Sequence, residues 1–262
     1  MKNALIRIYL LSKFLGFDPL VLVTNLKGIR FYIHDFLQLK KQKGTDTRFN
    51  FGRKYPILHE RYTESGKMSG HYFQQDLLVA QKIFEKNPDR HIDIGSRMDG
   101  FVAHLAVFRK VEVIDIRDQL TRVRNVLFRQ ADLMQLPDDL INCCDSVSSL
   151  HVIEHFGLGR YGDPIDYYGH LKAIDNIAKI LKPGGKFYFS VPIGQQRIEF
   201  NAHRVFSISY LLEILQPSFM LESFSYVNDK WTLFENIELD QNMVDTNCGC
   251  HYGCGIFELT KK

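Results

Sequence analysis

The 262-residue sequence has no long apolar run and no disulfide pattern. Near its start, Arg7, Lys13 and Asp18 interrupt the apolar residues before they reach the ~18 that a membrane-spanning helix needs. No small-residue cleavage site of a secretory signal follows them. The five cysteines include an adjacent pair, Cys143 and Cys144, and do not suggest a disulfide framework. We therefore expect a protein of the reducing cytoplasm without a transmembrane segment.

The sequence also lacks a strong net charge: at +3, the balance calls for neither nucleic acid nor a membrane. Basic residues are nevertheless concentrated between Lys40 and Lys54, where Phe49, Phe51 and Tyr55 interleave with them. A solvated loop is the simpler interpretation; binding to an anionic ligand or peripheral contact with a membrane surface stays open. No RNA-binding module precedes the loop, so nucleic acid is not an expected partner.

No internal repeat or low-complexity segment divides the chain, but its pattern changes near residue 70. Residues 3–41 predict two or three short amphipathic helices, with Asp18-Pro19 as a helix start. Beyond them, strand-like runs alternate with helix patterns. The expected fold class is α/β: a Rossmann-like, seven-stranded, mostly parallel sheet with helices on both faces. We assign residues 1–69 to a helical extension with the basic loop and residues 70–262 to the sheet domain.

The stretch HIDIGSRMDG at residues 91–100 predicts a buried strand, a glycine turn and a helix start. Such a loop binds a dinucleotide when glycine occupies its first, third and sixth positions. Gly95 and Gly100 fit the first and sixth positions, but Arg97 stands in the middle one, where it hinders the approach of a diphosphate. The loop therefore favours a cofactor without phosphates, such as S-adenosylmethionine (SAM).

Acidic residues stand at the ends of the first three predicted strands: Asp93, Asp115 and Asp132. A carboxylate at Asp93 can bind the SAM ammonium, and Asp115 can accept from two ribose hydroxyls. Asp132 can accept from the exocyclic amine of adenine. One strand-end aspartate is weak evidence, since such residues also form turns and helix caps. Three at successive strand ends favour SAM.

Five segments resemble, in order and spacing, the motifs of class I SAM-dependent methyltransferases: DIG at 93–95, VIDIR at 113–117, ADLMQLP at 131–137, DSVSSLHVIEH at 145–155 and LKPGGKFYFSVP at 181–192. The longer strings SGHYFQQDLLVA, DIGSRMDGFVAH, GLGRYGDPID and FNAHRVFS resemble an uncharacterised methyltransferase-like family. That family occurs in nematodes and in bacteria, often beside surface-polysaccharide (capsule) genes. The resemblance implies these SAM-binding residues: Tyr72, Asp93, Gly95, Ser96, Arg97, Asp115, Ile116, Asp132, Leu133 and His151.

Methyl transfer to an alcohol requires the acceptor oxygen about 3 Å from the methyl carbon and a base for its proton. The loops after the fourth and fifth strands offer two histidines as candidate catalytic bases, His155 and His203. The same loops carry the candidate acceptor-binding residues Arg160, Tyr161, Asp163 and Arg204. Histidine beside arginine suits a small hydroxyl acceptor with negative charge, such as a sugar, a nucleotide sugar or a phosphorylated metabolite.

Two other motifs compete with this interpretation. His151-Val-Ile-Glu-His155 spells an inverted zinc-protease motif, but that motif requires a helix, whereas these residues follow a strand. Tyr168 and Lys172 have the spacing of short-chain reductases, but the glycine-rich loop of those enzymes is missing. Neither motif therefore displaces SAM as the expected cofactor.

A stretch rich in metal-ligand residues lies near the end of the sequence, and it consists of Cys248, Cys250, His251 and Cys254. Zinc sites usually space their cysteines two to four residues apart in pairs, and C-x-C-H is cramped by comparison. We expect a glycine-rich surface turn here and no metal.

The sequence thus predicts a SAM-dependent O-methyltransferase that acts on a small sugar-like or phosphorylated acceptor in surface-polysaccharide biosynthesis. Two alternatives stay open. One is a catalytically silent methyltransferase fold that serves as a binding subunit in a glycan-assembly complex. The other is an NAD(P)-dependent sugar reductase or epimerase. Stabilisation of the fold by NAD(P) would favour the reductase or epimerase, and stabilisation by SAM would favour the methyltransferase or the silent binding subunit.

Overall fold

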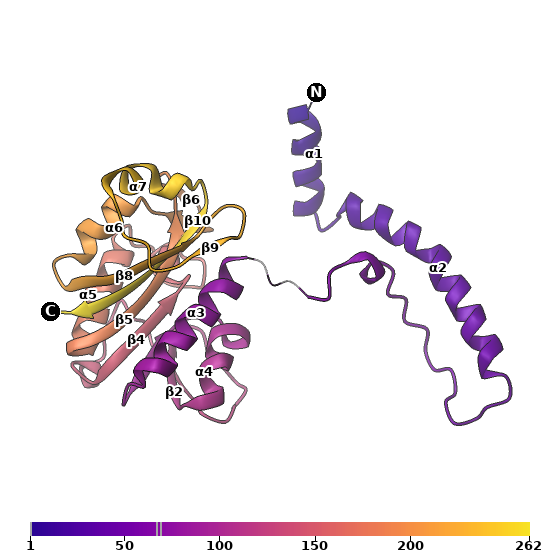
Figure 1. Cartoon of the computed structure of the whole chain (residues 1–262), viewed down its shortest axis with the longest axis horizontal. Coiled ribbons are helices and arrows are strands. Elements are labelled where there is room, and N and C mark those ends of the chain that lie inside the picture. Colours follow the sequence, from indigo (N-terminus) through magenta and orange to yellow (C-terminus); the bar gives the residue numbers. More distant parts are fainter. Residues whose placement is uncertain (1, 67, 69) are drawn as a thin grey trace. The chain divides into compact units, whose positions relative to one another are not determined.

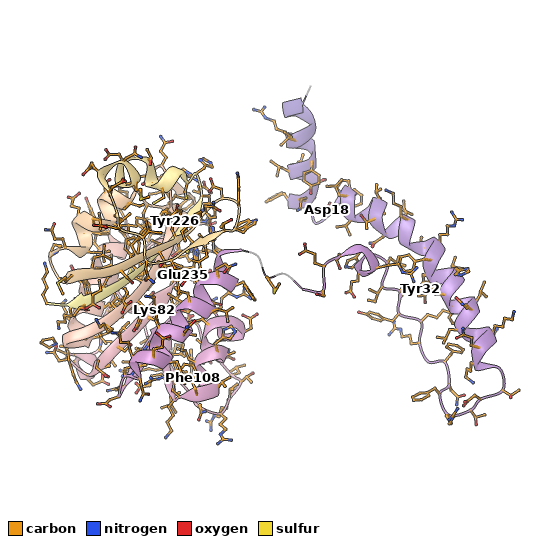
Figure 2. The ribbon with its side chains drawn as sticks, viewed as in Figure 1. Asp18, Tyr32, Lys82, Phe108, Tyr226 and Glu235 are labelled. Atoms are coloured by element: carbon orange, nitrogen blue, oxygen red, sulfur yellow. The ribbon has the colours of Figure 1, made fainter. Side chains whose placement is uncertain are left out.

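The computed structural model describes residues 2–66, 68 and 70–262, and the chain forms two compact units, residues 1–67 and 68–262 (Figure 1). The first unit contains α1 (Lys2–Phe14), α2 (Pro19–Lys43) and a short 3-10 helix, η1 (Glu60–Tyr62). Asp18 caps α2 as predicted: its Oδ1 accepts from the backbone N–H groups of Leu20 at 3.0 Å and Val21 at 3.4 Å (Figure 2). α2 is one 25-residue helix, longer than the short helices expected.

The segment after α2 returns along the helix and packs against it at Gly28. A Cβ atom at Gly28 would lie 2.1 Å from the carbonyl oxygen of Leu58, so only glycine admits this approach. In neither unit does a described helix combine the length and the apolar character that crossing a bilayer requires.

The second unit is built on one large sheet whose strand order is β3-β2-β1-β4-β5-β10-β8-β9. Its parallel part consists of β1 (His91–Ile94), β2 (Val111–Asp115), β3 (Val126–Gln130), β4 (Cys144–Leu150) and β5 (Leu181–Ile193). β10 (Gly253–Lys261) runs antiparallel between β5 and β8 (Phe219–Val227). β6 (Arg197–Glu199) and β7 (His203–Val205) form a separate hairpin. The expected mostly parallel α/β fold is confirmed.

The sheet has eight strands instead of the expected seven because β9 (Leu233–Phe234) adds to its edge. β9 has two residues, too few to show the alternation by which a strand is recognised in sequence. It is held by backbone pairing with β8 and by Phe234, whose ring stacks on that of Tyr226 with 4.8 Å between centroids.

Helices cover both faces of the sheet. On one face lie α3 (His71–Lys86), the π-helical turn η2 (Met98–Val102) and α4 (Ala103–Phe108); Ile83 and Phe101 pack there against Val113. On the other face lie α5 (Gly169–Ile180) and α6 (Ile208–Leu215), whose apolar sides pack against Ile92 and Phe187. The remaining short elements are η3 (Asp138–Leu140), η4 (Ile153–His155), α7 (Gln241–Thr246) and η5 (Asn247–Gly249).

The order of the strands determines where a ligand can enter. From β1 the chain proceeds to β2 and β3 on one side, and then crosses to β4 and β5 on the other. The loops that follow β1 and β4 therefore leave the sheet edge in opposite directions. In open α/β sheets, the crevice at this switch point is the ligand-binding position.

Candidate functional site

A cleft with two adjoining compartments opens at the carboxyl ends of β1, β2 and β4. One compartment has mainly apolar walls and spans about 580 Å³, counting the open space at its mouth. The other has mainly polar walls and spans about 880 Å³ on the same measure. The residues that line both are Gly95, Asp115, Arg117, His151 and Tyr161. Apart from Asp93, every residue predicted to bind SAM lines one compartment or the other.

Gly95 forms the turn between β1 and the loop that follows. Its φ angle is +65°, a left-handed conformation that residues with a side chain rarely adopt. A Cβ atom there would also lie 2.8 Å from Cγ1 of Val152, in the loop after β4. The left-handed φ angle and the close Val152 side chain together explain why this position needs glycine.

Asp93 accepts hydrogen bonds that fix the loop after β1. The backbone N–H of Ser96 donates to its Oδ1 at 2.9 Å, and the hydroxyls of Ser96 and Ser148 donate to its Oδ2 at 2.7 and 2.6 Å. Burial raises the pKa of Asp93 to about 6, and these hydrogen bonds oppose the rise. Asp93 is fully buried and is not among the described residues that line the cleft, so the structure does not place it for direct contact with a SAM ammonium.

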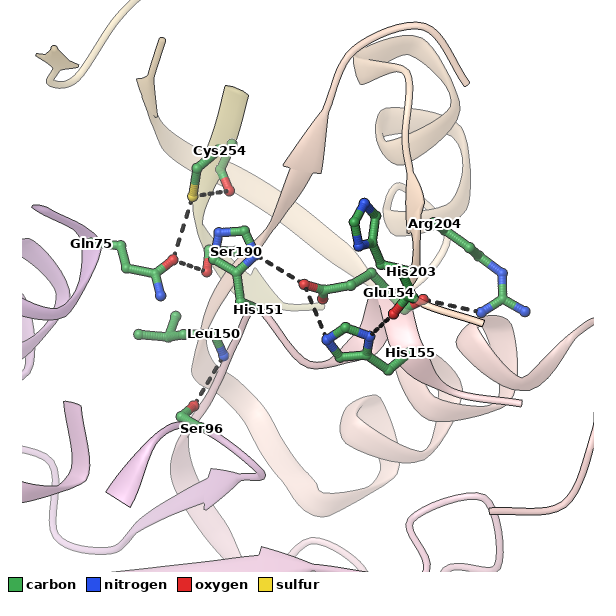
Figure 3. Close-up of polar contacts among 12 residues, drawn as sticks. Gln75, Ser96, Leu150, His151, Glu154, His155, Ser190, His203, Arg204 and Cys254 are labelled. Carbon is green, nitrogen blue, oxygen red and sulfur yellow. Dashed lines mark hydrogen bonds and ion pairs between the residues drawn. The ribbon is translucent and has the colours of Figure 1, made fainter. Parts of the chain in front are cut away.

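Ser96 joins this loop to the neighbouring strand. While its hydroxyl donates to Asp93, it accepts from the backbone N–H of Leu150 at 3.1 Å (Figure 3). Next to it, the Arg97 guanidinium lies 5.0 Å over the ring of Tyr72 and 2.9 Å from Asp99. Ser96, Arg97 and Tyr72 all line the polar compartment.

Asp115 ends β2 and is already engaged by a neighbour. It accepts from the Arg117 backbone N–H at 2.8 Å and from Arg117 Nε and Nη2 at 3.0 and 2.7 Å. The same guanidinium lies 4.3 Å over the ring of Tyr161. A carboxylate has about four acceptor positions. A diol that takes two of them must therefore displace one Arg117 hydrogen bond.

Ile116, Asp132 and Leu133 line the apolar compartment. Oδ1 of Asp132 accepts from the backbone N–H of Met134 at 2.9 Å, which fixes the turn after β3. The carbonyl of Leu133 accepts from the Asn176 side chain on α5 at 2.8 Å. These contacts hold the far wall of the compartment against the helix.

His151 stands at the junction of the compartments with an unusual backbone, at φ +55°. Its ring lies 5.1 Å from that of Tyr72, and its Nδ1 lies 2.9 Å from Glu154 Oε1. Burial lowers the pKa of His151, but the neighbouring Cys254 and Glu154 outweigh burial and raise this pKa to about 10.

His155 lines the apolar compartment from η4. Its Nδ1 is 2.7 Å from the carbonyl oxygen of Ala202, which can only accept, so Nδ1 carries the proton. Burial lowers the pKa of His155, so the ring is neutral near pH 7, and Nε2, 3.8 Å from Glu154 Oε1, carries the lone pair that can accept a proton. This is the tautomer that a general base requires.

His203 approaches His155 as the sequence predicts, with 6.5 Å between ring centroids. Its other contacts lead away from the cleft: Nε2 lies 3.2 Å from Glu199 Oε2, and the ring packs against Tyr252 at 5.2 Å. His203 stands outside the described lining of both compartments. The geometry therefore favours His155 over His203 as the base.

The structure does not bring Arg204 to the cleft. This buried guanidinium donates to the backbone carbonyls of Phe156 at 2.6 Å, Tyr167 at 3.1 Å and Glu154 at 3.4 Å (Figure 3). It holds the loop after β4 in place, and it is not among the described residues that line either compartment. These contacts give Arg204 a structural role, and its contact with an acceptor stays a prediction.

The other three acceptor candidates differ in their placement. Tyr161 lines both compartments, and Asp163 lines the apolar one. Asp163 accepts from the backbone N–H groups of Gly157, Gly159 and Tyr161, so it also shapes its loop. Arg160 is exposed and donates to the Ala202 carbonyl at 2.8 Å.

A family model described as "Caenorhabditis protein of unknown function, DUF268" matches residues 97–248, more than half of the chain. The chain belongs to this family. The match agrees with the nematode part of the resemblance seen in the sequence, while the link to bacterial polysaccharide genes stays a prediction. No curated protein matches the sequence.

Solved structures share the fold of this family member at low sequence identity. The 1,6-didemethyltoxoflavin-N1-methyltransferase of Burkholderia thailandensis, solved with S-adenosylhomocysteine, has a TM-score of 0.51 at 13% identity, over 72% of this chain and 78% of that one. A putative sarcosine dimethylglycine methyltransferase from Galdieria sulphuraria scores 0.50 at 12% identity, over 71% and 84%. The [4+2]-cyclase SpnF scores 0.50 at 15% identity, over 72% and 80%. The fold is that of class I SAM-dependent methyltransferases, and it also carries other chemistry.

Two residues of the site escaped the sequence interpretation. Arg117 pairs with the carboxylate of Asp115. Both residues stand in the VIDIR motif, but the sequence interpretation gave Arg117 no role. Glu154 is buried, with Oε1 2.9 Å from His151 Nδ1 and 3.8 Å from His155 Nε2. The HVIEH motif could have indicated a role for Glu154, because it places this acid between two histidines.

Proposed function

We propose that residues 70–262 form a SAM-dependent methyltransferase domain. The observation that carries the proposal is the single cleft at the switch point, lined by all the predicted cofactor residues except Asp93. Asp115 faces both compartments, where it can hold the ribose between adenine on the apolar side and methionine on the polar side. Arg97 in the turn disfavours a dinucleotide diphosphate.

We further propose transfer to an oxygen of a small sugar-like or phosphorylated acceptor. His155 supports this, because a neutral imidazole with an unprotonated Nε2 suits the removal of a hydroxyl proton. Arg97 and Arg117 line the polar compartment, but each is paired with an aspartate of the same lining, so a negatively charged acceptor stays a prediction from the sequence. A place in surface-polysaccharide biosynthesis stays a prediction.

Titration calorimetry with SAM, S-adenosylhomocysteine and NADH tests the cofactor. We expect both adenosyl ligands to bind, and SAM at about 100 times its Kd to stabilise the fold by ~2.7 kcal/mol. NADH binding without SAM binding would instead support the reductase. Methyl transfer is then measured by product mass with a panel of sugars, nucleotide sugars and sugar phosphates. If SAM binds but no member of the panel is methylated, the result would support the silent binding subunit.

Asp115→Ala should weaken SAM binding at least ~10-fold while the fold survives, because hydrogen bonds to a charged acceptor contribute roughly 1.5–3 kcal/mol. Calorimetry measures the affinity, and circular dichroism checks the fold. Asp138→Ala is the matched control: Asp138 is exposed, lies outside the described cleft lining, and should leave the affinity unchanged. Equal SAM affinity in the folded Asp115→Ala variant would refute the proposed ribose site.

A further inference from the structure

Two histidines and a cysteine from three separate segments converge behind the cleft wall. His71 begins α3, His151 follows β4, and Cys254 lies in β10; all three are buried. One ligand atom from each lies within 4.8 Å of the others. Across residues 2–66, 68 and 70–262, this is the only group of three or more such residues placed to hold a metal ion.

Each histidine has a ring nitrogen without a partner. The Nε2 atoms of His71 and His151 are buried and lack a hydrogen-bond partner within the described part of the chain. A buried polar atom left unsatisfied costs about 1–3 kcal/mol. Native proteins seldom leave two such atoms side by side. A species that bonds to both nitrogens removes this cost.

The surroundings orient these groups for a cation. The carboxylate of Glu154, 2.9 Å from His151 Nδ1, holds that ring with Nε2 directed away from it (Figure 3). Carboxylate–histidine pairs of this kind are typical second partners of metal-bound imidazoles. On the other side, the Cys254 thiol lies 3.4 Å from Gln75 Oε1, which also accepts from the Ser190 hydroxyl at 2.6 Å.

We propose that His71, His151 and Cys254 form a binding site for a divalent transition metal, and that Zn²⁺ is the ion it fits best. Imidazole and thiolate are preferred zinc ligands, and binding releases the protons that His151 and Cys254 hold in the absence of the ion. Three protein ligands leave a fourth position for water or substrate. Zinc bonds of about 2.0–2.3 Å put the ligand atoms roughly 3.3–3.6 Å apart, so a pair at the 4.8 Å limit must draw together by roughly 1.2–1.5 Å.

The proposed site departs from the expectation of no metal. It also differs from the cramped cysteine stretch near residue 250, of which it uses only Cys254. His151 also lines both compartments, so one ligand of the proposed ion forms part of the cleft wall. Metal binding does not depend on the proposed methyl transfer. It is measurable without any acceptor.

The test uses the full chain, treated with a chelator and then titrated with Zn²⁺ against a chromophoric competitor. Co²⁺ is titrated separately as a spectroscopic probe. We expect one Zn²⁺ per chain. We also expect the visible bands of tetrahedral Co²⁺ with a thiolate-to-metal charge-transfer band in the near ultraviolet.

Variants then identify the ligands. Cys254→Ser should abolish the charge-transfer band, and both Cys254→Ser and His71→Ala should weaken Zn²⁺ binding by at least ~100-fold. Glu154→Gln should weaken it by roughly 10–100-fold, since it removes only the group that orients His151. Cys250→Ser and His251→Ala are the matched controls and should leave both the affinity and the band unchanged. Circular dichroism of each metal-free variant checks the fold, and His71→Ala provides an independent test should the buried Cys254→Ser fail to fold.

Three results would overturn the proposal. One is failure of the full chain to bind either ion. Another is Zn²⁺ binding that survives His71→Ala and Cys254→Ser in folded protein. The third is binding that is lost in Cys250→Ser and His251→Ala, which would assign the metal to the stretch near residue 250.

Discussion

Replacing His155 with alanine should lower turnover by ~100-fold or more and leave SAM affinity unchanged. The hydrogen bond from Nδ1 to the Ala202 carbonyl leaves Nε2 as the proton acceptor, in a ring that lines the cleft. Removing the ring takes away the base and leaves the proposed ribose and adenine contacts in place. Steady-state kinetics with an acceptor found in the product-mass panel measure turnover, and calorimetry measures SAM affinity.

His203→Ala is the matched control, because that histidine lies 6.5 Å from His155 but contacts Glu199 and Tyr252 instead of the cleft. It should retain most of the wild-type turnover. Wild-type turnover in His155→Ala, or a larger loss in His203→Ala, would show that the base has been assigned to the wrong residue.

The pH profile gives a second test of His155. Burial lowers its pKa below 6.5; nearby Arg160 acts in the same direction, while Glu154 and the Ala202 carbonyl oppose it. Only the neutral ring accepts a proton, so turnover should be level at about pH 7–8 and fall as the pH drops through this lowered pKa. A fall that begins well above pH 6.5 would indicate a different group.

Arg204→Ala should lower the free energy of unfolding by about 3 kcal/mol or more. The change leaves the carbonyls of Glu154, Phe156 and Tyr167 without their donor in a buried place and creates a cavity. For a chain of this size, the loss corresponds to a fall in Tm of roughly 6–12 °C. Calorimetric or denaturant unfolding of the purified variant measures it.

Arg160→Ala is the control for this effect: the same residue type is exposed and makes one hydrogen bond to a carbonyl. It should cost less than about 1 kcal/mol. If Arg204→Ala instead keeps its wild-type Tm and raises the Michaelis constant of the acceptor, the residue binds the acceptor as the sequence suggested, and its structural role is of minor importance.

The sequence was sufficient for the frame of the site. Gly95, Asp115 and Asp132 were placed at strand ends from the alternation of strand and helix patterns. Parallel strands bring all their carboxyl ends to one edge, so residues at these positions must gather there whatever the details of packing. For the same reason the mostly parallel sheet was predictable, while the two-residue β9 was not, since its pairing is decided by Tyr226 and Phe234 across the edge.

Tertiary structure alone decided which polar side chains face the cleft and which support it. Asp93 and Arg204 carry the same charges as residues that bind ligands. Asp93 instead accepts hydrogen bonds from Ser96 in its own loop and Ser148 in β4, and Arg204 donates to carbonyls of the loop after β4. His71, His151 and Cys254 are far apart in the sequence, so no local spacing of residues predicts that they lie together. Periodicity reports only the direction in which a side chain leaves its own helix or strand. Which distant group it meets depends on how the helices and loops pack over the sheet, and that is fixed only when the whole chain folds.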